Sequence, residues 1–219
     1  MNPQIILIIL LGAALAAASV SFFIVGARQG RRTRTLARSA NEAGLLFSAD
    51  DLFESPRRYW GFSIIRCGHS QRASNVTYGR LTGLPLRAFD FRYEIGHGTR
   101  RVSLHYSVAI VETPKSLPVL SMWNLGDAEH APLEMRQGGV VIGDWSCRGD
   151  ASAAATIAAS GAELGKQGSS VETRGTTLLI CAPVVPGRPF DASGGLGILL
   201  KVLAADGGEG DRFDRRTKS

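Results

Sequence analysis

The two residues whose types and spacing best suit catalysis are Asp90 and His105. They lie on successive segments of alternating apolar and polar residues. We expect these segments, residues 84–95 and 100–112, to form an antiparallel hairpin around a Gly-rich turn of four residues. Counting outward from that turn places Asp90 opposite His105 on the polar face of the hairpin. A carboxylate that orients an imidazole is the supporting part of a hydrolytic triad or of a metal site.

A structural role competes with this catalytic interpretation, because no nucleophile lies in a suitable place. Ser103 and Ser107 share the predicted strand face with His105, but a catalytic serine normally lies in a strained turn. No Gly-x-Ser-x-Gly motif occurs in the sequence. We therefore favour a simple polar pair between two strands, and Asp90 and His105 as candidate catalytic residues are the alternative.

The sequence does not show the residue spacing that a metal or cofactor site needs. Cys67 and His69 could both bind a metal, but a zinc site takes three or four ligands, and the other His and Cys residues are scattered. The glycine cluster at 194–197 lacks the Lys-Ser or Lys-Thr pair of a phosphate-binding loop. We expect no metal and no cofactor, and ligands that converge only in the folded chain are the alternative.

A long apolar segment near the N-terminus precedes the elements that carry these residues. Residues 5–26 read IILIILLGAALAAASVSFFIVG, 22 residues without a charge, which is long enough to cross a bilayer as a helix. The four residues before it include no Lys or Arg, whereas a signal peptide normally begins with a basic region. We expect a membrane anchor, and a signal peptide cleaved near Ser19 is the alternative.

An arginine cluster directly after this segment predicts its orientation. Because basic residues stay on the cytoplasmic side, we expect residues 1–4 to lie outside and the C-terminal domain to lie at the inner face of the cytoplasmic membrane. The same arginines are candidates for contact with anionic lipid headgroups, and a pure topology signal is the alternative. The five residues are Arg28, Arg31, Arg32, Arg34 and Arg38.

Composition limits the remaining function classes. The chain has 219 residues and a formal net charge of +6. The arginine cluster supplies +5 of that charge, so we expect no nucleic-acid partner. An apolar fraction of 44% excludes a fully disordered chain. Three cysteines cannot build a disulfide framework, and free thiols suit a reducing compartment.

The rest of the chain predicts an α+β fold: one domain with an antiparallel β-meander and two or three packing helices. We expect a basic juxtamembrane linker at 27–38, the domain at 39–205 and a disordered tail at 206–219. The predicted strands are residues 62–67, 74–81, 84–95, 100–112, 119–123, 139–147, 171–174 and 176–182. The predicted helices are residues 36–47, a short turn after 48–51 that ends at Pro56, 150–166 with Asp150 as its cap, and 196–203.

Part of this domain carries a recognisable motif. Its first half reads R-x-x-N-V-x-x-G-x-x-x-G-x-P and its second half F-D-F-x-Y. Over residues 36–112 the chain resembles a family of uncharacterised bacterial α+β proteins that are often membrane-anchored. The resemblance implies one compact domain, with Gly79 and Gly83 in tight turns and Asp90 bonded across the sheet, and it implies no activity or cofactor. The motif residues are Arg72, Asn75, Val76, Gly79, Gly83, Pro85, Phe89, Asp90 and Tyr93.

These observations together predict a single-pass membrane protein whose cytoplasmic domain is an interaction or scaffold module. Its expected partners are the lipid bilayer and another membrane or cytoplasmic protein. The alternative is a membrane-tethered hydrolase that uses Asp90 and His105. The sequence does not set an oligomeric state.

Overall fold

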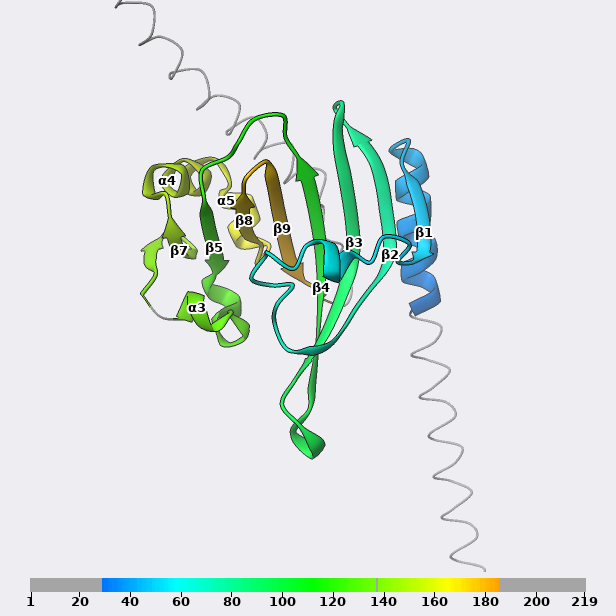
Figure 1. Cartoon of the computed structure of the whole chain (residues 1–219), viewed down its shortest axis with the longest axis horizontal. Helices are drawn as coiled ribbons and strands as arrows, with labels where there is room; N and C mark the ends of the chain where they lie inside the picture. Colours follow the sequence, from blue (N-terminus) through cyan, green and yellow to red (C-terminus); the bar gives the residue numbers. More distant parts are fainter. Residues whose placement is uncertain (1–28, 137, 186–219) are drawn as a thin grey trace, which may run out of the picture.

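An antiparallel sheet of nine strands forms the centre of the domain (Figure 1). The computed structural model describes residues 29–136 and 138–185. The strand order is β1-β2-β3-β4-β9-β8-β5-β7-β6, and every neighbouring pair is antiparallel. The strands are β1 (Leu46–Asp50), β2 (His69–Leu81), β3 (Leu84–Ile95), β4 (Val102–Glu112), β5 (Leu120–Asn124), β6 (Val140–Ile142), β7 (Trp145–Gly149), β8 (Ser170–Arg174) and β9 (Thr177–Pro183).

Short helices pack around this sheet, so the predicted α+β class is confirmed. Within the described residues, no helix has the length and apolar character that crossing a bilayer requires. The predicted span at 5–26, the external residues 1–4, the helix at 196–203 and the tail at 206–219 lie outside the described residues. The helices are residues 29–42, α2 (Ser55–Arg58), η1 (Gly98–Arg100), η2 (Leu125–His130), α3 (Leu133–Arg136), α4 (Ala151–Ser160) and α5 (Ala162–Lys166).

The N-terminal helix, residues 29–42, begins earlier and ends earlier than the sequence predicts. It crosses the predicted border between linker and domain at residue 38 without a break. Gly44, with φ at +69°, follows its end, and the next residues form β1 instead of continuing the helix. One side of the helix is buried against the sheet and the opposite side is exposed. Residues 29–38 of the predicted linker are therefore part of the folded domain.

Both faces of the sheet are covered, which gives the domain two hydrophobic cores. On one face, apolar residues such as Leu178 and Ile180 pack with α4 and α5 and with Ala40 of the N-terminal helix. On the other face, Leu179 and Cys181 pack under residues 53–67 and under η2 and α3. The alternation along β9 follows from the pleat, which points successive side chains to opposite faces. Each fully buried leucine or isoleucine stabilises the fold by about 1.5–3 kcal/mol.

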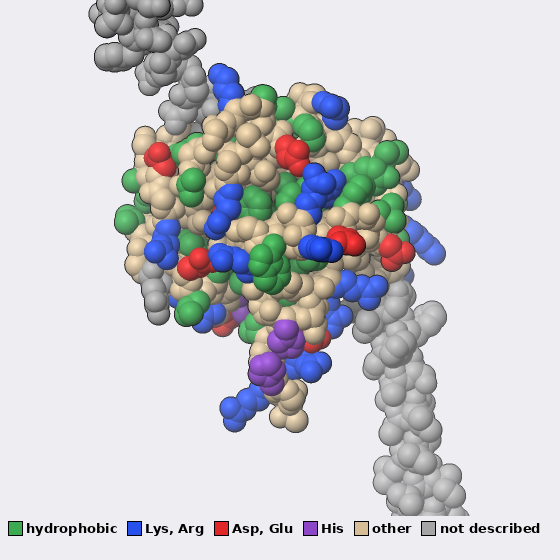
Figure 2. Space-filling model, viewed as in Figure 1, with side chains coloured by type: hydrophobic (Ala, Val, Ile, Leu, Met, Phe, Trp, Pro, Cys, Tyr) green, Lys and Arg blue, Asp and Glu red, His purple; other side chains and the backbone are tan. Residues whose placement is uncertain are grey.

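The segment at 62–67 is not the predicted strand. It runs as consecutive turns over the face of the sheet, with Phe62, Ile64 and Ile65 buried beneath it. Pro56 is the second residue of α2 and does not end a helix, because proline fits the first helical positions. Figure 2 shows the outer surface of this covering layer, where basic, acidic and apolar side chains are interspersed.

The β3–β4 hairpin is confirmed, but its predicted register is wrong by two residues. Asp90 lies opposite Ser107, and His105 lies opposite Arg92. The turn is longer than four residues because η1 (Gly98–Arg100) is inserted in it. A shift of two residues keeps each side chain on its predicted face, so the apolar and polar faces of the hairpin are as expected.

The second half of the sheet follows the sequence pattern more closely. The predicted final hairpin is confirmed as β8 and β9, although it is inserted between β4 and β5. The predicted strand at 139–147 is two strands, β6 and β7, that turn at Gly143. Asp150 caps α4, because its Oδ1 accepts the backbone N–H groups of Ser152 at 2.9 Å and Ala153 at 3.0 Å. Such a cap contributes about 1 kcal/mol.

Candidate functional site

Asp90 lies at the centre of a polar cluster that fixes the N-terminal helix to the sheet. Arg32 donates to both Asp90 oxygens, from Nε at 2.8 Å and from Nη2 at 2.6 Å. The same Nη2 donates to the Ser107 hydroxyl at 2.9 Å. The hydrogen bonds to Asp90 raise the pKa of Arg32, and burial opposes that change. We call Arg32, Asn75, Asp90 and Ser107 the helix-docking cluster.

Asn75 completes this cluster from a bulge in β2. Its backbone has φ at +53°, in the left-handed region that asparagine tolerates better than most residues. Its amide nitrogen donates to Asp90 Oδ2 at 2.9 Å, and its amide oxygen accepts from the Thr33 hydroxyl at 2.9 Å. The side chain therefore joins the sheet to the helix. This geometry gives a physical role to two residues of the sequence motif, Asn75 and Asp90.

His105 is not part of this cluster. It is exposed on β4, and among the described residues no hydrogen bond joins it to Asp90. The pKa of His105 is lowered, mainly because part of the ring is buried and secondly because Arg92 carries a positive charge nearby. The predicted pairing of Asp90 with His105 is therefore wrong, because the hairpin register brings Ser107 opposite Asp90 instead. Asp90 is occupied by an arginine and does not orient an imidazole.

The arginines of the basic cluster divide between two sides of the N-terminal helix. Arg31, Arg34 and Arg38 are exposed, whereas Arg32 points to the sheet with its side chain 26% exposed. The prediction that Arg32 contacts the membrane surface is wrong, since its guanidinium is used inside the domain. Arg28 lies outside the described residues. The three exposed arginines remain candidates for contact with lipid headgroups.

Cys67 and His69 do not come together as metal ligands. Within the described ranges, no group of three or more His, Cys, Asp or Glu side chains could hold a metal ion. The Cys67 thiol donates to the Ser63 carbonyl oxygen at 3.3 Å, and burial raises the pKa of this thiol to about 11. The His69 ring stacks on His97, with 5.2 Å between ring centroids. Both residues have structural contacts.

A buried polar network that the sequence did not reveal lies under η2. The Tyr106 hydroxyl donates to Asp127 Oδ2 at 2.6 Å, and His130 Nδ1 lies 2.7 Å from Asp127 Oδ1. The Trp123 indole N–H donates to the backbone oxygen of Asp127 at 2.9 Å. The Asp-x-x-His spacing of Asp127 and His130 is the signal that could have indicated this pair, because residues three apart meet on one helical turn.

A groove of about 770 Å³ opens beside this network. It lies between the turn end of the β3–β4 hairpin, the turns at 63–68 and the segment formed by η2 and α3. Tyr93 and Cys67 line it, as does His130. The rest of its wall combines apolar, small polar, basic and one acidic residue: Ile95, Leu104, Ala131, Pro132, Leu133, Ser63, Gly68, Arg66, Arg136, Arg148 and Glu134. An open groove with apolar and basic side chains in its wall suits an amphiphilic ligand better than a small polar substrate.

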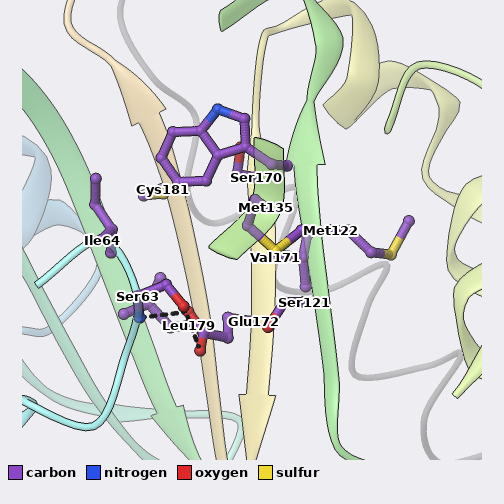
Figure 3. A pocket seen from close by; sticks show the side chains of 11 residues that line it. Ser63, Ile64, Ser121, Met122, Met135, Ser170, Val171, Glu172, Leu179 and Cys181 are labelled. Carbon is purple, nitrogen blue, oxygen red and sulfur yellow. Dashed lines mark hydrogen bonds between the residues drawn. The ribbon is translucent and has the colours of Figure 1, made fainter. Parts of the chain in front are cut away.

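A second buried carboxylate, Glu172 on β8, holds the covering segment in place (Figure 3). Its Oε2 accepts the Ser63 backbone N–H at 2.8 Å, and its Oε1 accepts the Ser63 hydroxyl at 3.2 Å. Arg174 Nε donates to Oε1 at 2.8 Å. The cavity beside these groups measures about 10 Å³, which leaves no space for a substrate. Glu172 therefore has a structural role.

Comparison with known proteins gives one similar fold. No protein-family profile and no curated protein matches the chain. Among solved structures, the chain is similar to the mycobacterial trehalose monomycolate transport factor A, TtfA, with a TM-score of 0.53 and 14% sequence identity. The alignment covers 80% of this chain and 90% of that chain. At this identity the likeness shows a shared fold alone.

Proposed function

We propose that this chain is a membrane-tethered interaction module without enzymatic activity of its own. The observation that carries the proposal is the docking of the N-terminal helix, residues 29–42, which follows the predicted span at 5–26 in the sequence. Arg32 and Thr33 bond this helix to β2, β3 and β4. A helix fixed in this way would hold the domain in one orientation near the bilayer, which suits a scaffold that presents one surface to a partner.

The arrangement of charges supports the same proposal. Arg31, Arg34 and Arg38 lie on the exposed side of the helix, where they would meet anionic headgroups and keep this side of the span in the cytoplasm. The two residues predicted to form a hydrolytic pair are not opposite each other and share no hydrogen bond within the described residues, and Asp90 is bonded to Arg32. We therefore favour a binding role over hydrolysis for the polar face of β3 and β4.

The fold likeness suggests a more specific version of this role. TtfA is described as a transport factor for trehalose monomycolate. We propose that this chain, with the same fold, is also an accessory factor that assists a membrane protein rather than performing chemistry. Its partner would be another protein of the inner membrane or one that works at its cytoplasmic face.

In-cell crosslinking of the full chain, followed by extraction with detergent and mass spectrometry, tests this proposal. The matched control lacks residues 1–28 only, because a deletion up to residue 38 would also remove Arg32 and damage the domain. We expect the full chain to sediment with membranes and to capture a defined membrane-associated partner, and the shortened chain to lose both. A full chain that stays in the soluble fraction, or equal capture by both versions, would refute the tethered module.

A further inference from the structure

The N-terminal helix enters the domain at the end that carries the β3–β4 turn. Arg32 bonds to Asp90, whereas Leu45, after the helix, packs against Gly79. Gly79 pairs with Leu86 near the start of β3, and Asp90 lies further along β3 towards Ile95. The start of the helix therefore points in the same direction as the β3–β4 hairpin (Figure 1).

The groove of about 770 Å³ opens at this same end. Ile95 and Leu104, which flank the hairpin turn, form part of its wall. Leu133, the first residue of α3, is 72% exposed, although a leucine gains by burial. If the chain leaves this end of the domain to enter a bilayer, the groove faces the lipid surface.

The basic rim of the groove includes arginines that are not neutralised by an acidic side chain among the described residues. Arg66 pairs with Glu134 at 2.5 Å. Arg136 and Arg148 donate only to backbone carbonyl oxygens, and within the described part of the chain neither has an acidic partner. Two guanidinium groups are thus available to an anion, and arginine binds phosphate oxygens especially well.

A polar group in the groove also lacks a partner. Tyr93 is 1% exposed, and its hydroxyl makes no hydrogen bond within the described residues. Tyr93 lines the groove. Because this oxygen is itself buried, the polar contacts available to a ligand in the groove come from the arginines.

We propose that this groove binds an anionic phospholipid of the bilayer that holds the tether. Arg136 and Arg148 would bind the headgroup phosphate, while Leu133, Ile95 and Leu104 would contact the glycerol and the first part of the acyl chains. The inference rests on the proposed membrane tether, which sets the direction in which the groove faces. It adds a second contact with the membrane, on the far side of the domain from the exposed helix arginines.

Native mass spectrometry of the full chain in nonionic detergent, with phosphatidylglycerol or phosphatidylcholine added, tests this binding. We expect phosphatidylglycerol to bind more tightly than phosphatidylcholine. Each basic residue near an anionic headgroup is worth about fivefold in affinity, so the Arg136→Gln, Arg148→Gln double variant should bind roughly 25-fold more weakly. The matched control, Arg80→Gln with Lys115→Gln, removes the same charge from the opposite end of the sheet.

Leu133→Asp provides a second variant that keeps the fold intact, because this side chain is exposed. It should weaken phosphatidylglycerol binding about tenfold by adding negative charge and removing apolar contact. Equal binding of the two lipids, or unchanged binding by both groove variants, would overturn the proposed site. Displacement of the lipid by inorganic phosphate would show a simple anion site and also overturn it. Alkaline extraction of membranes tests the tether separately, so the two proposals can fail independently.

Discussion

Replacing Arg32 with alanine should loosen the N-terminal helix from the sheet. The guanidinium makes three hydrogen bonds, two with the Asp90 carboxylate and one with the Ser107 hydroxyl. Without it, Asp90 keeps the Asn75 amide but remains a charged group whose side chain is only 17% exposed. The substitution therefore leaves a poorly solvated charge as well as removing an attraction.

The size of the effect follows from the geometry of this pair. Breaking one partner of a fully buried ion pair costs about 3–5 kcal/mol. The Arg32 side chain is 26% exposed, so water recovers part of that loss. We expect the free energy of unfolding to fall by about 2–3 kcal/mol, which for a domain of this size lowers Tm by roughly 4–12 °C.

Urea denaturation of the full chain in detergent, monitored by tryptophan fluorescence, measures this loss of stability. Trypsin cleavage after Arg38 reports detachment of the helix itself and should become faster. Arg34→Ala is the matched control, because Arg34 lies on the exposed side of the same helix and its removal should cost less than about 0.5 kcal/mol. If Arg32→Ala shifts the urea midpoint no more than Arg34→Ala does, the helix is not held by this cluster.

Three further predictions test other parts of the structure. Gly149→Ala should lower the free energy of unfolding by more than about 2 kcal/mol, because the φ of Gly149 is +101° and a Cβ would lie 2.2 Å from a backbone oxygen. Gly175 has φ at +55° but open space around it, so Gly175→Ala should cost only about 1–2 kcal/mol. Equal urea midpoints for the two variants would contradict this difference in packing. Glu172→Gln should lower the free energy of unfolding by about 1–3 kcal/mol, since Ser63 loses a charged acceptor, and an unchanged denaturation curve would argue against that role. Burial raises the pKa of Cys67 from 9.0 to about 11, so its contribution to stability is complete below pH 9 and is lost as the pH rises through 11; Cys67→Ala should reduce this alkaline loss, and a pH profile identical to that of the native chain would oppose it.

Sequence reasoning succeeded where the signal was local. The bounds of β3 match the prediction residue for residue, and the β8–β9 hairpin lies where glycine at 175 indicates a turn. Asp150 caps α4 as expected. In each case a few adjacent residues determine the outcome, because alternation, turn geometry and capping act over short distances.

The failures concern contacts between residues far apart in the chain. Residues 62–67 have the apolar character of a strand, but a covering segment that is pinned by Glu172 buries the same residue types. The length of the β3–β4 turn, and with it the partner of Asp90, depends on a 3-10 helix that periodicity does not reveal. Arg32 was grouped with its neighbours as a basic cluster, because only the tertiary structure shows which arginine turns inward.

The insertion of β8 and β9 between β4 and β5 has a consequence for biosynthesis. β4 and β5 are consecutive in sequence but separated in space by the last strands of the described chain. Until residues 170–183 leave the ribosome, β4 is an unpaired edge with a long apolar face. The β1–β4 meander can form early, whereas the whole sheet closes only after β8 and β9 have been synthesised. A nascent chain of this topology is therefore most exposed to misassembly between the emergence of β4 and that of β9.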